Sequence, residues 1–450
     1  MRVRSVILAA GQGTRMRSEI PKVLHPLLGQ AMLQYALDAV KPVTAEKPIL
    51  VVGHGAEALH QAFGGSVEFV LQEPQLGTGH ATAQAEPLLR DEADLVLVTY
   101  GDMPLLTSET IGKIVQIQAT HAGPLTMLTL VAQEARGFGR VLRDEQGWVR
   151  KIVEEAQATP DELEIHELNV GVYCFQADWL WNALRRIPLS PKGEYYLTDT
   201  VGLAVSDGLT VQACLLDDAS EGIGINTRVH LAEAEAVLRR RINEKWMLAG
   251  VTLVDPVRTY IEPGVRIGQD TVIWPDTYLQ GNTVIGAGCT LGPNTIIWRS
   301  QIGDQCRVVA SVVEGALVEE QVQIGPFGHL RSGAHLARGV HMGNFGEVKN
   351  SYLGPFTRMG HFSYVGDAQV GPDVNIGAGT ITCNFDGQKK NPTEIGQGAF
   401  IGSGTMLVAP VKLGEGAQTG AGAVVTQDIP PYTLSVGVPA HPIRKLRQGE

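Results

Sequence analysis

The second half of the chain, from residue 251 to about residue 435, is built on a six-residue repeat in which an aliphatic residue precedes a glycine. Several neighbouring units are separated by six residues or by a multiple of six. The units include Ile267-Gly268, Ile285-Gly286, Leu291-Gly292, Ile302-Gly303, Ile324-Gly325, Val365-Gly366, Val370-Gly371, Ile376-Gly377, Ile395-Gly396, Ile401-Gly402 and Leu413-Gly414. Such a unit is too short for an antiparallel strand and its turn. It suits a short strand whose aliphatic residue points inward and whose glycine takes the corner.

Three such units would close one triangular coil, and the coils would stack around one continuous aliphatic core. The alternative is a glycine-rich disordered segment. The regular aliphatic positions argue against it, because disordered chains lack that apolar surface. We therefore expect a solenoid.

The first half of the chain has a different pattern, in which short apolar runs alternate with helical stretches. The runs cover residues 3–9, 48–52, 67–71, 94–99 and 125–131. Uninterrupted apolar runs are typical of buried parallel strands, so this half is expected to be a Rossmann-like α/β domain with a mostly parallel sheet. In such folds ligands bind beyond the carboxyl ends of the strands.

Residues 227–248 are rich in strong helix formers, and Gly250 is a plausible stop. The chain is thus expected to comprise an α/β domain at 1–226, a linker helix at 227–250, and a repeat domain with a C-terminal tail at 251–450. At about 1.5 Å per residue the helix would span about 30 Å and hold the two domains apart.

Composition narrows the classes of partner. The net charge of −11 argues against nucleic acid, since phosphate binding needs a basic face. The five cysteines show no CxxC spacing, so we expect reduced thiols in a cytoplasmic protein rather than disulfides or zinc sites. No segment has the length of a membrane span, and the N-terminal apolar run is too short for a signal peptide.

The first candidate site is a glycine-rich turn, Gly11-Gln12-Gly13, that follows the first apolar run. Such a turn lets backbone N–H groups approach phosphates, while Arg15 and Lys22 would supply positive charge. A dinucleotide fingerprint is not satisfied, because Met16 stands where the third glycine belongs. A P-loop is excluded too, since no GKS or GKT follows.

Further motifs accompany this turn. The segments LAAGQGTRM, PKVLHPLLG, QLGTGHA and YGDMPLL resemble the sugar-1-phosphate nucleotidyltransferases, and among them the uridyltransferases that make UDP-N-acetylglucosamine. The resemblance implies a UTP site comprising Leu8, Ala9, Ala10, Gly11, Lys22, Gln72, Gly77, Thr78, Tyr100, Gly101 and Asp102. It also implies a sugar site at Gly139, Glu154 and Asn169, and a magnesium ion held by Asp102 and Asn226.

The reaction itself favours such a set. Attack of a sugar phosphate on the α-phosphorus of UTP brings anions together, so Mg²⁺ with Arg15 and Lys22 would offset the charge. No general base is needed, because the nucleophile is already an anion. Two structural alternatives stay open: Asp102 as the cap of a helix beginning at Met103-Pro104, and Asn169 and Asn226 as turn residues.

The second candidate site lies between residues 327 and 391, where polar residues interrupt the repeat. Arg331 and Lys349 are 18 residues apart, so in a coil of 18 residues they should stack and form a phosphate site. His361 is the candidate base, because a neutral imidazole can take the proton released in N-acetylation. Glu347 would hold the imidazole or balance its charge. A purely structural histidine is the alternative.

The segments KNSYLG, GHFSYVGDA, NIGAGTITCNFDG and SGTMLVAP resemble the hexapeptide acyltransferases. Nearly the whole chain resembles a family of bifunctional bacterial enzymes, glucosamine-1-phosphate N-acetyltransferases that are also N-acetylglucosamine-1-phosphate uridyltransferases and supply precursors of peptidoglycan and lipopolysaccharide. The resemblance implies a left-handed parallel β-helix, a homotrimer with sites shared between chains, and acetyl-CoA and UTP as cosubstrates. It places glucosamine-1-phosphate at Arg331, Lys349, Tyr364, Asn375 and Lys390, and acetyl-CoA at Ala378, Asn384, Phe385, Ser403 and Ala421.

Two departures from that family put coenzyme affinity in doubt. Phe385 stands where a tyrosine is frequent, and Gly437 replaces an arginine that helps to bind the coenzyme phosphate, which Arg444 or Lys445 would have to replace. Two other functions stay open: a regulatory assembly protein without catalysis, and a single-activity uridyl- or thymidylyltransferase with a structural solenoid. Retention of Arg15, Lys22, Asp102 and Asn226 favours an enzyme.

Overall fold

The computed structural model of the chain describes residues 1–44 and 46–445. The chain divides into two compact units, Met1–Leu238 and Arg239–Glu450. The division falls inside helix α9 (Arg228–Leu248), so each half of this helix belongs to a different unit. No helix among the described residues has the length and apolar content needed to cross a bilayer.

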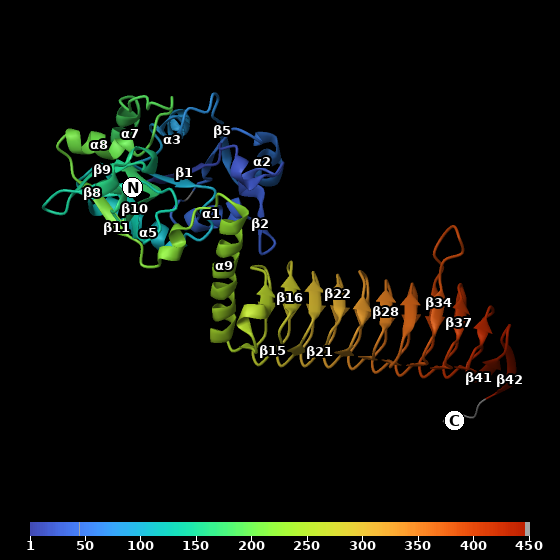
Figure 1. The fold of residues 1–450 in the computed structure, drawn as a ribbon. Helices are drawn as coiled ribbons and strands as arrows, with labels where there is room; N and C mark the ends of the chain where they lie inside the picture. Colours follow the sequence, from blue (N-terminus) through green and yellow to red (C-terminus); the bar gives the residue numbers. More distant parts are fainter. Residues whose placement is uncertain (45, 446–450) are drawn as a thin grey trace. The chain divides into compact units, whose positions relative to one another are not determined.

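The first unit is an α/β domain around one sheet with strand order β11-β7-β10-β6-β1-β4-β5 (Figure 1). The pairings are parallel except those of β10, which runs antiparallel to β6, β7 and β8, and of the β8–β9 hairpin. Its strands are β1 (Val3–Leu8), β4 (Ile49–Val52), β5 (Glu68–Leu71), β6 (Leu95–Tyr100), β7 (Leu125–Val131), β8 (Arg140–Arg143), β9 (Val149–Val153), β10 (Glu167–Gln176) and β11 (Val211–Leu215), with β2 (Pro26–Leu27) and β3 (Gln30–Ala31) forming a separate pair.

Alternate residues of the central strands enter two cores, one on each side of the sheet. In β1, for example, Ile7 packs in one core and Val6 in the other. The helices are α1 (Met32–Val40), α2 (Ala56–Phe63), α3 (Thr78–Ala83), α4 (Glu86–Leu89), α5 (Ser108–Thr120), α6 (Pro160–Leu163), α7 (Ala177–Leu184) and α8 (Asp199–Ser206). The expected α/β class is confirmed, and the five apolar runs correspond to β1, β4, β5, β6 and β7.

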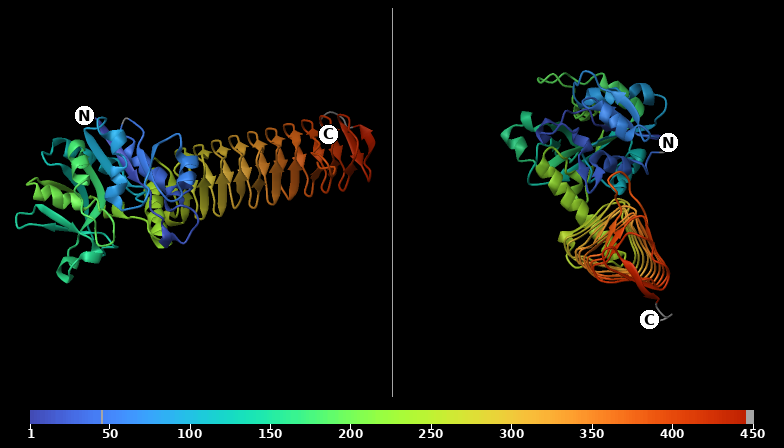
Figure 2. Two further views of the ribbon diagram at one scale, coloured as in Figure 1. Left: turned by 90° about the horizontal axis from the view of Figure 1, so that it is seen from above. Right: turned by 90° about the vertical axis from the view of Figure 1, so that its right-hand side faces the viewer.

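The second unit is a left-handed parallel β-helix with three flat faces, whose triangular section is visible end-on in Figure 2. Each complete coil contributes one strand to each face. Face A contains β12 (Thr252–Leu253), β15 (Val272–Ile273), β18 (Thr290–Leu291), β21 (Arg307–Val308), β24 (Gln323–Ile324), β27 (His341–Met342), β30 (Arg358–Met359), β33 (Asn375–Ile376), β36 (Phe400–Ile401), β39 (Gln418–Thr419), β41 (Thr433–Val436) and β42 (His441–Lys445).

The other two faces follow the same order. Face B contains β13 (Thr259–Ile261), β16 (Thr277–Gln280), β19 (Thr295–Trp298), β22 (Val312–Glu314), β25 (His329–Leu330), β28 (Gly346–Lys349), β31 (Ser363–Gly366), β34 (Ile381–Cys383), β37 (Met406–Val408) and β40 (Val424–Val425). Face C contains β14 (Arg266–Ile267), β17 (Val284–Ile285), β20 (Gln301–Ile302), β23 (Leu317–Val318), β26 (His335–Leu336), β29 (Tyr352–Leu353), β32 (Ala368–Val370), β35 (Thr393–Ile395) and β38 (Val411–Leu413).

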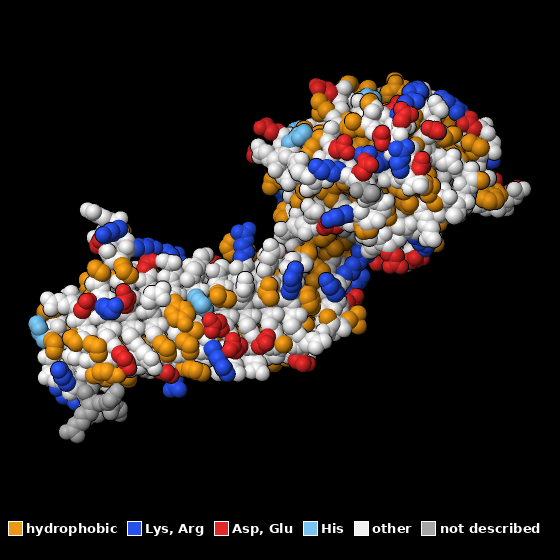
Figure 3. All heavy atoms as spheres, turned by 180° about the vertical axis from the view of Figure 1, so that it is seen from behind, with side chains coloured by type: hydrophobic (Ala, Val, Ile, Leu, Met, Phe, Trp, Pro, Cys, Tyr) orange, Lys and Arg blue, Asp and Glu red, His pale blue; other side chains and the backbone are white. Residues whose placement is uncertain are grey.

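The aliphatic residue of each strand points inward and stacks on that of the next coil. On face A this column includes Ile273, Leu291, Val308, Ile324 and Met342, none more than 1% exposed. The column holds its alignment although the coils differ in length, because the corners absorb the difference. On the face drawn in Figure 3, acidic and basic side chains are interspersed over both units.

The second half of α9 closes the first coil of the solenoid. Ile242 and Trp246 pack against the solenoid core. Between them Asn243, 1% exposed, donates from Nδ2 to the carbonyl oxygens of Pro256 at 2.7 Å and Thr259 at 3.0 Å. A solenoid needs its terminal coils covered, so this half-helix is a cap as well as a connection.

We predict that Asn243→Ala destabilises the solenoid unit by about 1–3 kcal/mol, because the buried carbonyl of Thr259 and the half-buried carbonyl of Pro256 lose their donor. The unfolding transition of this unit, followed by circular dichroism in denaturant, measures the change. Glu244→Ala is the matched control, since Glu244 is exposed and forms a 4.0 Å surface pair with Arg240. Equal midpoints for the two variants would contradict the capping role.

Two candidate active sites

The first unit contains a cavity of about 400 Å³ beyond the carboxyl ends of β1 and β6. The glycine-rich turn after β1, the start of α3 and the end of β6 form its wall. Ten residues expected at the nucleotide line it: Leu8, Ala9, Ala10, Gly11, Lys22, Gln72, Gly77, Thr78, Tyr100 and Asp102. Gly101 is not in the lining; its N–H donates to Leu8 O at 3.0 Å and holds the two strand ends together.

An adjoining cavity of about 280 Å³ shares Thr78, Tyr100 and Asp102 with the first. The residues expected at the sugar, Gly139, Glu154 and Asn169, line this second cavity together with Asn226. The two cavities therefore meet at Asp102. Burial, and next the Asp102 carboxylate, raise the pKa of Tyr100, so its phenol stays neutral.

Side-chain amides fix the walls of the nucleotide cavity. Gln72 Nε2 donates to Gly77 O at 2.9 Å, and Gln75 Nε2 donates to Ala10 O at 2.7 Å. Gly77 has φ 92°, and a Cβ there would lie 2.7 Å from Tyr195 O, so only glycine fits this turn. Gln75 was missed from the sequence, although it lies three residues after Gln72, because its contact joins segments far apart in the chain.

The sugar cavity depends on an irregularity in β10. The register of β10 against β7 shifts between Asn169 and Tyr173. Asn169 Oδ1 accepts hydrogen bonds from Gly171 N at 3.1 Å and Tyr173 Oη at 3.0 Å. Glu154 Oε1 accepts from Thr198 Oγ1 at 3.0 Å. Thr198 and Tyr196 also line this cavity, and nothing in their surrounding sequence marked them.

The charged centre lies where the two cavities meet. Lys22 forms an ion pair with Asp102, and its Nζ donates to Asn226 Oδ1 at 2.9 Å. Arg15 lies outside both cavity linings but donates to the same Asn226 oxygen at 2.9 Å. Asp102 does not cap a helix, since α5 begins at Ser108 with Thr107 as its cap.

The two expected metal ligands, Asp102 and Asn226, thus both contact the Nζ atom of Lys22. One carboxylate and one amide oxygen are a donor set that Mg²⁺ accepts when substrate phosphates complete its coordination. The described residues contain no cluster of three or more histidine, cysteine, aspartate or glutamate side chains that would hold a metal without such help. The residues therefore fit a magnesium ion that binds together with a nucleotide.

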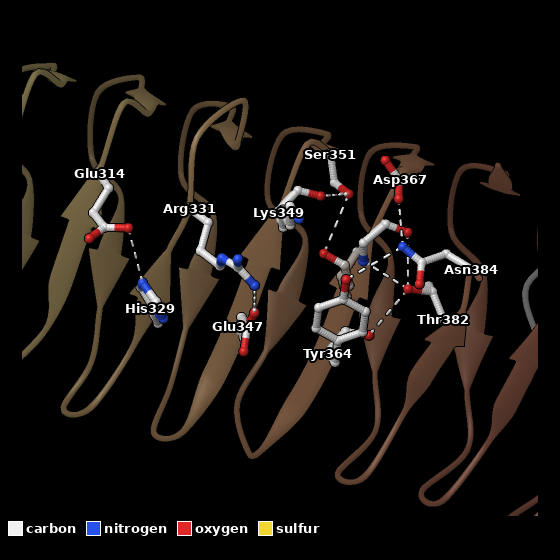
Figure 4. Close-up of polar contacts among 12 residues, drawn as sticks. Glu314, His329, Arg331, Glu347, Lys349, Ser351, Tyr364, Asp367, Thr382 and Asn384 are labelled. Carbon is white, nitrogen blue, oxygen red and sulfur yellow. Dashed lines mark hydrogen bonds and ion pairs between the residues drawn. The ribbon is translucent and has the colours of Figure 1, made fainter. Parts of the chain in front are cut away.

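The second site is built on face B of the solenoid. His329 lies opposite Glu347 in the β25–β28 register, which places Arg331 opposite Lys349, as the 18-residue spacing predicts. Arg331 NH1 donates to Glu347 Oε1 at 2.9 Å (Figure 4). The ammonium of Lys390, and next the guanidinium of Arg331, lower the pKa of Lys349 from its ordinary value. Three cations therefore crowd together with one carboxylate among them.

Lys390 comes from a loop between β34 and β35 that projects from the coil in Figure 1. Phe385 pairs with Lys390 across this loop. Asp386 closes it by accepting from Gln388 N at 2.9 Å and Lys389 N at 2.8 Å. The hydrogen bond from Lys389 N, and next that from the Asn391 side chain, lower the pKa of Asp386 to about 2.

The A–B corner carries His361, which follows β30. Because Met359 pairs with Ile376 and Ile376 with Ile401, His361 falls in one column with Ala378 and Ser403. Gly422 N donates to Ser403 O at 2.8 Å and extends the column to Ala421. His361 is exposed, and within the described chain no hydrogen bond reaches its imidazole. Glu347, which was expected to hold the imidazole, forms an ion pair with Arg331.

The single chain does not bring all expected residues together. Lys349 lies opposite Gly366, which is five residues beyond His361. At about 3.3 Å per residue, five extended residues span at most about 16 Å, so the backbones of His361 and Lys349 lie at opposite edges of face B. Asn375 lies on face A. Arg444 and Lys445 pair with Leu434 and Thr433, at the edge of face A away from Ala421.

Comparison with known proteins agrees with both halves of the chain. Residues 5–165 match the MobA-like NTP transferase domain, and residues 264–297 and 392–427 match the bacterial transferase hexapeptide (six repeats). Three relatives named bifunctional protein GlmU each align with 96% of this chain. They are from Exiguobacterium sibiricum, 46% identical over 96% of its length, Shouchella clausii, 44% over 95%, and Heliobacterium modesticaldum, 47% over 94%. The chain therefore belongs to the GlmU family of bifunctional proteins.

Proposed function

We propose that the chain catalyses two successive transfers. It acetylates glucosamine-1-phosphate with acetyl-CoA, and it transfers UMP from UTP to N-acetylglucosamine-1-phosphate, giving UDP-N-acetylglucosamine and pyrophosphate. The observation that carries this proposal is that each unit has a cationic centre of its own. Lys22 with Arg15 forms the first, and Arg331 with Lys349 and Lys390 forms the second.

Uridyl transfer follows from the two cavities that meet at Asp102. A phosphate oxygen of the sugar phosphate attacks the α-phosphorus of UTP, and the bond to the β-phosphate oxygen breaks. Lys22 and Arg15 offset the negative charge that gathers there. Asp102 and Asn226 would hold Mg²⁺, which neutralises charge on the triphosphate. The first cavity would then hold UTP, and the second the sugar.

Acetyl transfer follows from the solenoid centre. The nitrogen of the amino sugar attacks the thioester carbonyl, the C–S bond breaks, and His361 takes the proton that the nitrogen loses. Arg331, Lys349 and Lys390 hold the phosphate, whose binding relieves their mutual repulsion. Ala378, Ser403 and Ala421 form the corner along which acetyl-CoA would lie. Asn384 and Phe385 follow β34 at the other edge of face B, so they would reach the coenzyme from a neighbouring copy.

The distance across face B supports a homotrimer with shared sites. The amine and the phosphate of glucosamine-1-phosphate are only a few bonds apart, whereas His361 and Lys349 lie at opposite edges of the face. Within a single chain the backbones of these two residues are farther apart than the two groups of the substrate. The base of one copy and the cations of another would have to meet, and Asn375 on face A would join from its own side.

An exposed aromatic ridge offers the surface for such contact. Phe327, Phe345 and Phe362 follow one another along the A–B corner beside His361 and are 57%, 59% and 60% exposed. The rings of Phe327 and Phe345 stack with centroids 5.1 Å apart. Large exposed apolar patches mark interaction surfaces, and we propose a second copy of this chain as the occupant.

We also propose a cytoplasmic location. All five cysteines are unpaired thiols, which is typical of a reducing compartment.

A coupled assay tests the proposed function. The protein is incubated with glucosamine-1-phosphate, acetyl-CoA, UTP and magnesium, and each component is omitted in turn. Free thiol reports acetyl transfer, and pyrophosphate reports uridyl transfer. Omission of acetyl-CoA should abolish both signals, and added N-acetylglucosamine-1-phosphate should then restore the pyrophosphate signal alone. A protein that releases neither product would overturn the proposal.

His361→Ala should lower acetyl transfer by about 10²–10⁴-fold, because the amine loses its proton acceptor. Uridyl transfer should stay unchanged, since its residues lie in the other unit. His341→Ala is the control, because His341 is an exposed histidine of face A outside the site. Loss of both activities in a folded His361→Ala protein would refute the assignment.

Asp102→Ala should show the opposite selectivity. We expect uridyl transfer to fall by about 10²-fold or more, because the triphosphate charge loses its bound counter-ion, while acetyl transfer persists. Pyrophosphate release measured against magnesium concentration tests this. Asp217→Ala, which removes an exposed partner of Lys113, serves as the control. An unchanged magnesium dependence for Asp102→Ala would remove Asp102 from the metal site.

Replacing Phe327 and Phe345 together by asparagine should shift the protein from trimer to monomer and lower acetyl transfer. Both residues have positive φ, 61° and 55°, which asparagine tolerates well, so the coil should stay folded. Light scattering and activity across a dilution series measure both effects. Phe356→Asn is the matched control, since Phe356 has φ 59° and is 49% exposed on the C–A corner. A trimer of unchanged stability would exclude the ridge.

A further inference from the structure

A chain of hydrogen bonds lies next to the three cations of face B. Asp367 links Asn350 to Asn384 in this chain, and its contact with Asn384 is drawn in Figure 4. Its Oδ1 accepts from Asn350 Nδ2 at 2.6 Å, and its Oδ2 accepts from Asn384 Nδ2 at 2.5 Å. The same Asn384 nitrogen lies 3.4 Å from Tyr364 Oη. Asp367 has no role in the transfers described above. It nevertheless contacts Asn384, which is expected at acetyl-CoA, and Asn384 in turn contacts Tyr364, which is expected at glucosamine-1-phosphate.

The backbone fixes the Asp367 carboxylate at this corner. Asp367 has φ 51°, a left-handed conformation that aspartate and asparagine tolerate better than most residues. Its N–H donates to Lys349 O at 3.1 Å, and its carbonyl accepts from Thr393 N at 3.1 Å. The carboxylate is therefore held between the coil that carries Lys349 and the coil that carries Asn384.

Asp367 decides which way the Asn384 amide points. Asn384 is 7% exposed, and its Nδ2 faces the carboxylate. A flipped amide would place Oδ1 against the carboxylate, and two acceptors cannot pair. The Oδ1 is thus turned away from Asp367, and in the described part of the chain no side-chain donor reaches it. The amide oxygen of this largely buried residue is left available for a donor from outside the chain.

Gly366 leaves room for this arrangement. A Cβ at residue 366 would lie 2.3 Å from Tyr364 Oη and 2.8 Å from Asn384 Nδ2. The phenol and the amide therefore lie over the glycine backbone, in space that any other residue would fill. Two side chains expected at the two different substrates are packed into one pocket by the pair Gly366-Asp367.

We propose that Asp367 is a positioning residue for acetyl transfer. Its carboxylate fixes the Asn384 amide and, through it, the Tyr364 phenol, so that Asn384 Oδ1 accepts a hydrogen bond from an N–H group of a substrate. That N–H belongs either to the amino sugar or to an amide of the acyl carrier. The proposal rests on the proposed acetyl transfer.

Three variants test the pairing as a double-mutant cycle. Asn384→Asp places two carboxylates in contact, so acetyl-transfer kcat/KM should fall by about tenfold or more, the effect of losing one hydrogen bond to a charged group. Asp367→Asn alone should cause a smaller loss, since its amide accepts from only one of two donors. The double variant restores an amide–carboxylate pair with the partners exchanged, and it should recover about fivefold or more over Asn384→Asp.

Asn350→Ala is the matched control, because it removes the other partner of the same carboxylate without contacting either expected substrate residue. Its acetyl transfer should stay within about twofold of the parent, and uridyl transfer should be unchanged in every variant. The KM that rises, for glucosamine-1-phosphate or for acetyl-CoA, identifies the source of the N–H group.

The outcomes separate the two proposals. A parent protein without acetyl transfer overturns the proposed function itself. With an active parent, a double variant no better than Asn384→Asp refutes positioning by Asp367. Should Asn384→Asp fail to fold, Asp367→Gly replaces it, since glycine keeps the backbone conformation and removes the carboxylate. Activity within twofold of the parent for Asp367→Gly would then exclude the role.

Discussion

The inward stacking of one aliphatic side chain per strand is the constraint on which the solenoid unit depends. Ile273, Leu291 and Val308 show how each coil buries its apolar residue only against its neighbours, so no coil is stable alone. Because the stack fixes the register, every outward side chain repeats at a nearly constant place on its face. Arg331 and Lys349 are held close together by this register, although like charges repel.

In the α/β unit, charged side chains are brought together in a different way. Its buried strands end together, and the chain leaves each end through a turn with polar side chains. Lys22 and Asn226 are far apart in sequence, yet both approach Asp102 because β6 ends there. The Asp102 carboxylate and the Asn226 amide oxygen both contact the Lys22 ammonium. An incoming phosphate would have to take the place of these partners, so the ammonium has an acceptor before and after it binds an anion.

Sequence periodicity predicts most of the fold, since the six-residue repeats and the apolar runs correspond to strands. It predicts the Arg331–Lys349 stack for the same reason. Periodicity does not identify Gln75, Tyr196 or Asp367 as site residues. Each of them acts through contacts with segments that are distant in the sequence, and no repeat or motif marks such contacts. The helix at 227–248 is found by propensity, but its polar composition does not reveal that Asn243 caps a coil. The helix-cap alternative for Asp102 was likewise excluded only by where α5 begins.

The last strand of the solenoid has a consequence for assembly. A parallel stack ends in an edge whose N–H and C=O groups invite another strand. Here β42 turns back and pairs antiparallel with β41, and it carries His441, Arg444 and Lys445 on its exposed length. A further coil could not pair in parallel with β41, because β42 already occupies that edge with the opposite direction and carries basic side chains. The parallel stack therefore ends at β41, and a second solenoid could not extend it coil upon coil in the same strand direction.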